Sequence, residues 1–187
     1  MSSLFVEQIA SEEALRQGAE AEDWEVASRF GSEHRRCEAL AWRAIVRREL
    51  GADCRISYDE WGAPVVDSAN THISVSHCDK FVAVIISDHP CAVDIESLDR
   101  NFVRIAERYM SQEESQLCSD ERWCAMVWCA KEALYKLYRK GGIDFLRDIK
   151  ILSYDTASQS IEASLPDRKG ITVKIDQRDG YIVARID

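Results

Sequence analysis

The sequence predicts an α+β fold, in which helices and antiparallel strands are combined in one chain. Three features predict it. Residues 123–139 contain no glycine or proline and are rich in good helix formers, so we expect a long helix there. Residues 81–87 and 91–96 are apolar runs on either side of an Asp-His-Pro turn, which favours an antiparallel strand pair. From residue 148 onward, short segments separated by turns predict a meander of strands.

The other elements follow from local signals. Residues 4–10 predict a first strand and residues 11–29, rich in Glu and Ala, predict helical structure. Ser32 is placed to cap a helix that ends at Gly51. Further along we expect a turn at 58–66, a strand at 72–78, a helix at 101–108, a helix opening at Ser111, strands at 148–153, 160–165, 171–176 and 181–186, and turns near Gly170 and Asp179-Gly180.

Composition and charge favour some classes of protein and exclude others. The chain has 187 residues, of which 46% are hydrophobic and 30% charged, as is usual for a globular protein. Its net charge of −9 argues against non-specific binding to nucleic acid or to anionic membranes. We expect no signal peptide and no membrane span. The seven cysteines show no C-x-x-C pair, so we expect reduced thiols and a cytoplasmic protein.

A pair of carboxylates stands out at residues 91–96. Asp94 and Glu96 lie two residues apart in a strand-like run, so their side chains are expected on one face. Two like charges this close repel each other. Two interpretations stay open here: a strand end with both acids in water, or half of a divalent-metal site whose hard oxygen ligands suit magnesium.

Three further patterns each allow two interpretations. The helix 32–50 carries Arg36, Arg43 and Arg47 on one face, either as solvated charges or as a grip on phosphate. Ser111 and Glu114 form a capping box, so Glu114 is either a helix cap or a catalytic carboxylate. The third pattern is Glu132 and Lys136, one helical turn apart, either an exposed ion pair or part of a site.

Five motifs, in order along the chain, resemble those of the 4′-phosphopantetheinyl transferase superfamily. The most specific is W-x-x-K-E-A-x-x-K, matched by residues 128–136. The others are G-[K/R]-P, similar to residues 62–64; [N/S]-x-S-H, similar to 74–77; G-[I/V]-D-[I/V]-E, similar to 92–96; and F-[S/F]-x-x-E, similar to the segment that ends with 111–114.

The resemblance implies a fold and a reaction. In the surfactin-synthetase-activating type, two similar α+β halves form an intramolecular pseudo-dimer, here residues 1–98 and 99–187, with the active site between them. The implied reaction is Mg²⁺-dependent transfer of 4′-phosphopantetheine from coenzyme A to a serine of an acyl or peptidyl carrier protein, with release of adenosine 3′,5′-bisphosphate. We expect a monomer without nucleic-acid or membrane partners.

The resemblance also implies roles for single residues. Asp94, Glu96 and Glu132 are the expected metal ligands. Lys136 is expected to stabilise the leaving group. Glu114 is the first choice as base, with a metal-bound water as the second. The expected coenzyme A contacts are Arg36, Arg43, Gly62, Pro64, Ser76, His77, Lys131 and Lys136.

The chain departs from the family pattern at a few positions. Ala63 replaces a basic residue, Ala92 replaces a glycine, and Tyr109-Met110 stand where phenylalanines are common. A coenzyme A-binding module without transfer activity is therefore an alternative, and an unrelated magnesium-dependent phosphohydrolase is another. For carrier docking we expect Arg100, Arg104 and Arg108 on one helix face, with solvated surface as the plain alternative.

Overall fold

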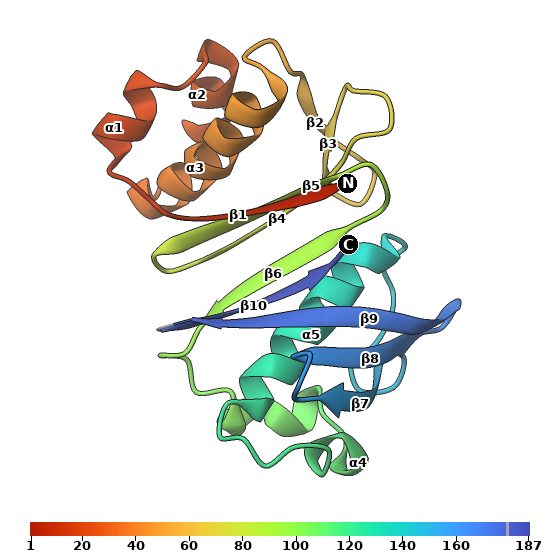
Figure 1. Cartoon of the computed structure of the whole chain (residues 1–187). Coiled ribbons are helices and arrows are strands. Elements are labelled where there is room, and N and C mark those ends of the chain that lie inside the picture. Colours follow the sequence, from red (N-terminus) through yellow and green to blue (C-terminus); the bar gives the residue numbers. More distant parts are fainter. Residues whose placement is uncertain (179) are drawn as a thin grey trace.

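Four layers make up the molecule in the computed structural model, which describes residues 1–178 and 180–187. Figure 1 shows the helices α1–α3 at one side, then two antiparallel sheets face to face, then helix α5. Each of the two large sheets is thus covered on its outer face by helices, and β2 and β3 form a separate two-stranded sheet. The α+β prediction is confirmed.

The first half builds the upper sheet and its helices. Its three-stranded sheet has the order β1-β5-β4 and is antiparallel throughout. Helix α3 ends as expected at Gly51, whose φ of +104° suits a glycine. The elements are β1 (Ser2–Gln8), α1 (Glu12–Gln17), α2 (Ala21–Ala27), α3 (Glu33–Leu50), β2 (Ile56–Tyr58), β3 (Pro64–Val66), β4 (His72–Cys78) and β5 (Phe81–Ser87).

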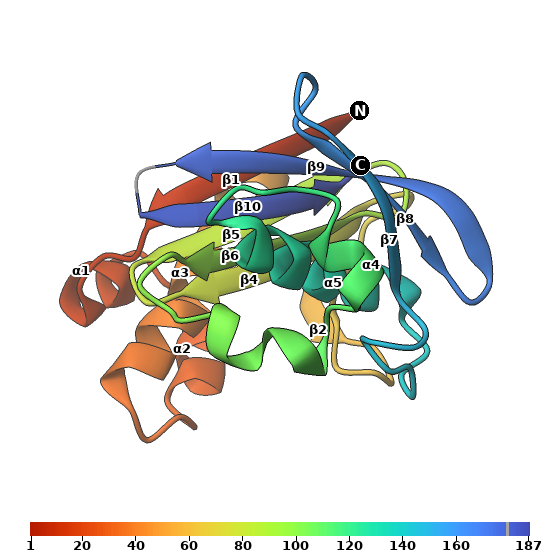
Figure 2. The same cartoon turned by 90° about the horizontal axis from the view of Figure 1, so that it is seen from below.

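The second half builds a five-stranded sheet of order β6-β10-β9-β8-β7, and the predicted meander is confirmed. Helix α5 lies on the outer face of this sheet and packs against β6 and β10 (Figure 2). Of the predicted turn at Asp179-Gly180, Asp179 lies outside the described residues. The elements are β6 (Ala92–Ser97), η1 (Val103–Arg108), α4 (Gln112–Ser115), α5 (Trp123–Tyr138), β7 (Lys150–Asp155), β8 (Ser160–Leu165), β9 (Arg168–Arg178) and β10 (Tyr181–Ile186).

The predicted hairpin of residues 81–87 with 91–96 is wrong. Strand β5 pairs with β1 on one edge and β4 on the other, so neither edge is free for β6. Strand β6 instead pairs with β10, almost ninety residues further along. It precedes the expected boundary at 98/99 and yet belongs to the sheet of the second half, so the boundary itself stays a prediction.

The two halves share a core between their sheets. It combines residues of β5 with residues of β6 and β10, and Ile85 and Val183 are almost fully buried within it. The outer edge of β6 is satisfied by side chains rather than by a neighbouring strand. The Val93 N–H donates to Ser74 Oγ at 3.1 Å, and Lys136 Nζ donates to the Val93 carbonyl at 3.0 Å.

The prediction that Arg100, Arg104 and Arg108 share one helix face is also wrong. Residues 103–108 form a 3₁₀-helix, in which positions four apart are rotated by about 120° and do not share a face. Arg100 lies before this helix and binds Glu96 instead. No helix of the described residues is long and apolar enough to cross a membrane.

Candidate active site

A pocket of about 450 Å³ lies between the two halves. This volume is within the range of sites that bind nucleotide-sized ligands. One wall is the turn between β2 and β3, where Asp59 Oδ1 accepts hydrogen bonds from the backbone N–H groups of Trp61 and Ala63, both at 2.9 Å. Gly62 has a φ of +79°, so the turn requires a glycine there. Gly62 and Pro64 both line the pocket.

The pocket is cationic in an acidic protein. Arg35, Lys136 and Arg139 line it, against the single carboxylate of Glu38. Glu38 is buried, and His77 Nδ1 lies 2.9 Å from its Oε1, while its Oε2 has no hydrogen-bond partner among the described residues. Burial lowers the pKa of His77, and this outweighs the opposite effect of Glu38. A pocket of this charge suits a phosphorylated ligand.

Asp94 is not part of the pocket lining, but it contacts Lys136, which is. Its Oδ1 accepts hydrogen bonds from Ser76 Oγ and from Lys136 Nζ, both at 2.8 Å. Its Oδ2 is buried and has no hydrogen-bond partner among the described residues. A buried oxygen without a partner costs free energy, so Asp94 is arranged to bind something further.

Glu96 and Glu132 complete a cluster of carboxylates around Asp94. Glu96 Oε1 accepts from Trp128 Nε1 at 2.5 Å and from Arg100 Nη1 at 3.0 Å. Burial raises the pKa of Glu96, and the charge of Asp94 adds to this effect. Burial and Asp94 likewise raise the pKa of Glu132 to about 7. Burial and the repulsion by Asp94 thus both disfavour the charged forms of Glu96 and Glu132.

The three side chains of this cluster have the chemistry of divalent-cation ligands. Three carboxylates, one with an unpartnered buried oxygen, are the hard ligands that magnesium prefers. Among the described residues, the ligand atoms of Glu12, Glu33 and Cys37 all lie within 4.8 Å of one another, whereas those of Asp94, Glu96 and Glu132 are spread more widely. Arg36 already neutralises Glu12, so the first of these two groups needs no cation.

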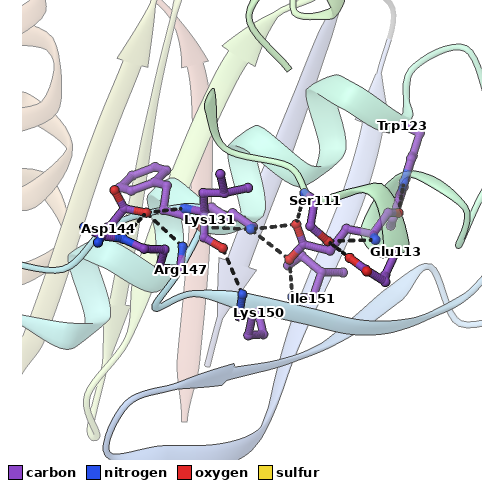
Figure 3. A network of polar contacts seen from close by, with 11 residues as sticks. Ser111, Glu113, Trp123, Lys131, Asp144, Arg147, Lys150 and Ile151 are labelled. Carbon is purple, nitrogen blue, oxygen red and sulfur yellow. Dashed lines mark hydrogen bonds and ion pairs between the residues drawn. The ribbon is translucent and has the colours of Figure 1, made fainter. Parts of the chain in front are cut away.

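Glu114 and Lys131 lie together, away from the pocket. Glu114 accepts a hydrogen bond from the Ser111 N–H, which completes the predicted capping box, and another from the Ile151 N–H. Lys131 Nζ lies 2.8 Å from Glu114 Oε1 and 2.9 Å from Oε2, and it also donates to the Phe145 carbonyl. Figure 3 shows this network, with Lys131, Ser111 and Ile151 labelled. Both side chains are buried, and neither lines the pocket.

The predicted row of arginines faces α1 and α2. Arg36 pairs with Glu12 at 2.7 Å, and Arg47 donates to Asp23. Arg43 is buried beside Asp23, with its Nε 3.3 Å from Oδ1. These guanidinium groups hold the helices of the first half together, and the pocket is lined by Arg35 instead.

The comparisons with known proteins agree on one family. A profile described as "4'-phosphopantetheinyl transferase superfamily" matches residues 90–185, about half of the chain. The chain belongs to the 4′-phosphopantetheinyl transferase superfamily. This match includes the carboxylate cluster and the W-x-x-K-E-A-x-x-K helix.

Three curated relatives carry the same name. The 4'-phosphopantetheinyl transferase gsp of Aneurinibacillus migulanus is 32% identical over 44% of this chain, and ffp of Bacillus subtilis is 36% identical over 48%. Sfp of Bacillus subtilis (strain 168) is 27% identical over 67% of the chain. These alignments span 37%, 43% and 59% of the respective relatives.

Sequence motifs of the 4′-phosphopantetheinyl transferase superfamily did not indicate every pocket residue. The sequence does not indicate Arg35, because its neighbour Arg36 continues the helical row, and it does not indicate Glu38, because the partner His77 lies far along the chain. Arg139 is distinguished by its left-handed backbone, with a φ of +50°, which the sequence does not indicate. Ala92, a departure from the family pattern, has its methyl group in the core of the second half, outside the pocket lining.

Proposed function

We propose that this chain transfers 4′-phosphopantetheine from coenzyme A to a serine hydroxyl of an acyl or peptidyl carrier protein, with release of adenosine 3′,5′-bisphosphate. One observation carries the proposal. Lys136 lines a cationic pocket between the halves and also binds Asp94, whose second oxygen is buried and unpartnered. A phosphate-binding pocket thus meets a carboxylate cluster with the chemistry of Mg²⁺ ligands.

We assign Asp94, Glu96 and Glu132 as the residues that hold Mg²⁺. When bound, the ion would neutralise charge on the pyrophosphate of coenzyme A. Ser76 and Lys136 fix Asp94 through Oδ1, so that Oδ2 is available to the ion. Trp128 fixes Glu96 in the same way. Held ligands lose little conformational freedom on binding.

Other residues orient the substrate. Lys136 would place its ammonium group on the pyrophosphate and stabilise the leaving adenosine 3′,5′-bisphosphate. Gly62, Pro64 and His77 would contact the nucleotide end from the wall of the first half, where the structure also places Arg35. The expected contacts of Arg36, Arg43 and Lys131 with coenzyme A stay predictions.

The acceptor serine has to lose a proton during the transfer. Glu114 stays our prediction for the base, and a variant pair described in the Discussion tests it. That the protein acts as a monomer in the cytoplasm also stays a prediction, which its sequence alone supports.

The deciding experiment is intact-mass spectrometry of an apo carrier protein incubated with this chain, coenzyme A and Mg²⁺. We expect the carrier to gain one phosphopantetheine, and no gain without Mg²⁺ or with Glu132→Ala, whose folding is checked by circular dichroism. Release of phosphopantetheine to water would indicate a hydrolase. Saturable coenzyme A binding with no product from several carriers would indicate the silent module and overturn the proposal.

A further inference from the structure

Arg139 ends helix α5 in a conformation that L-residues rarely adopt. Its φ of +50° and ψ of 28° are left-handed, at a position where helices usually have glycine. Glycine takes this conformation without steric cost, whereas an arginine is strained there. Strain of this kind persists where a side chain has a use that offsets it.

The side chain of Arg139 crosses from the second half of the chain to the first. Its Nη2 donates to the Pro64 carbonyl at 3.4 Å, and its Nε lies 3.8 Å from Asp59 Oδ2. Both contacts are long for a guanidinium group, which has five N–H donors. The side chain is 35% exposed and lines the pocket, so donors are left that can face a ligand there.

Arg139 lies where the chain lacks an expected cation. Ala63 replaces the basic residue of the G-[K/R]-P turn and lines the same pocket. The carbonyl that Arg139 contacts belongs to Pro64, the next residue. Trp61 of this turn packs on Gly141, which follows Arg139 by two residues, so the turn and the end of α5 are in contact.

We propose that Arg139 binds a phosphate group of the ligand and replaces, from the other half of the chain, the cation that Ala63 lacks. This inference rests on the proposed function, since it takes the ligand to be coenzyme A. A guanidinium group suits the task because its planar fork matches two phosphate oxygens. The phosphate is either the 3′-phosphate or the pyrophosphate.

Calorimetric titration of Arg139→Gly with coenzyme A tests the proposal. We expect the variant to melt at the same or a higher temperature, because the strain is removed, and to bind roughly 10- to 100-fold more weakly, as for loss of a charged hydrogen bond. The matched control is Asn70→Gly, the same change at another left-handed position (φ +58°), on the exposed turn before β4. The control should bind as the wild type does.

A rescue and a second ligand sharpen the test. Arg139→Gly combined with Ala63→Lys should regain most of the lost affinity, since the cation returns to the turn. If 3′-dephospho-coenzyme A shows the same loss on Arg139→Gly, the contact is with the pyrophosphate, and if it shows none, with the 3′-phosphate. Each of these results supports the proposal.

The opposing outcomes are separable. Wild-type protein that modifies a carrier, together with an Arg139→Gly variant that binds coenzyme A equally well, overturns the role of Arg139 alone. If the variant melts at a lower temperature and Ala63→Lys does not restore binding, Arg139 only stabilises the contact between the halves. That result also overturns its role in phosphate binding. Wild-type protein that neither binds coenzyme A nor modifies any carrier overturns the proposed function as well.

Discussion

At the scale of single residues, the two carboxylate oxygens of Asp94 have different surroundings. Ser76 and Lys136 bind Oδ1 and fix the carboxylate, whereas Oδ2 stays without a partner. The sequence predicted that Asp94 and Glu96 lie on one face, because both belong to a strand. It could not predict that Ser76 would bind Asp94 and Ser74 the backbone of Val93, since both contacts join strands that are distant in sequence.

Trp128 gives a first prediction at this scale. Trp128→Phe keeps an aromatic ring against Tyr109 and Phe145 and removes the N–H that binds Glu96. Loss of such a supporting contact typically weakens metal binding by about 10- to 100-fold. We expect this loss in a calorimetric Mg²⁺ titration.

The matched control is Trp123→Phe on the same helix. Its indole N–H donates to the Glu114 carbonyl at 2.8 Å, so the same chemical change leaves Glu96 untouched. Equal weakening of Mg²⁺ binding by both variants would contradict a specific role for Trp128.

Cys91 gives a second prediction. It lines the pocket, and burial raises the pKa of its thiol to about 11. At pH 8 roughly one molecule in a thousand then carries the reactive thiolate. We expect iodoacetamide to modify the partly exposed Cys118 well before Cys91, as followed by peptide mass mapping, and the rate at Cys91 to rise as the pH approaches 11. Equal rates at pH 8 would refute the shielded thiol.

At the scale of elements, helix α5 shows which parts of a site a sequence can predict. Its span was predicted almost to the residue, because helix formers and the absence of glycine and proline are local signals. The motif also placed Glu132 and Lys136 on one face. It did not separate Lys131, which lies on another face and is fully buried against Glu114. Only the contacts of Lys131 with Glu114 and with the Phe145 carbonyl, both distant in sequence, decide that difference.

The Lys131–Glu114 pair gives the third prediction. Lys131→Met leaves the Glu114 carboxylate buried without its counter-charge, and removal of one partner of a buried pair costs about 3–5 kcal/mol. We expect urea denaturation to show this loss. The double variant Lys131→Met/Glu114→Gln should recover part of it, because no buried charge is left.

The same double variant tests Glu114 as the base. If it folds and still modifies a carrier at a comparable rate, Glu114 does not accept the serine proton, and its role is the helix cap and the ion pair. Lys136→Met is the matched control on α5. Its side chain reaches the pocket and is 28% exposed, so transfer should be lost with a smaller change in stability.

At the scale of the whole molecule, the two halves are bound by a core that neither could complete alone. Strand β6 forms hydrogen bonds within the sheet of the second half, and its inner side chains pack against β5 of the first. The pocket draws its walls from both halves in the same way. The apolar runs predicted these strands correctly, but their partners were not predictable, because long-range pairing leaves no local signal in one sequence.

The shared core leads to the last prediction, that the chain unfolds in one transition. Ile85 from the first half and Val183 from the second are both buried in this core. We expect Ile85→Ala to cost about 2–5 kcal/mol and Val183→Ala somewhat less, since fewer methyl groups are removed. Each variant should shift the whole calorimetric transition, with equal van't Hoff and calorimetric enthalpies. Leu152→Ala, at an exposed position of β7, should shift it little. Two transitions, of which Ile85→Ala moves only one, would show that each half folds on its own and that the active site is assembled from two independent units.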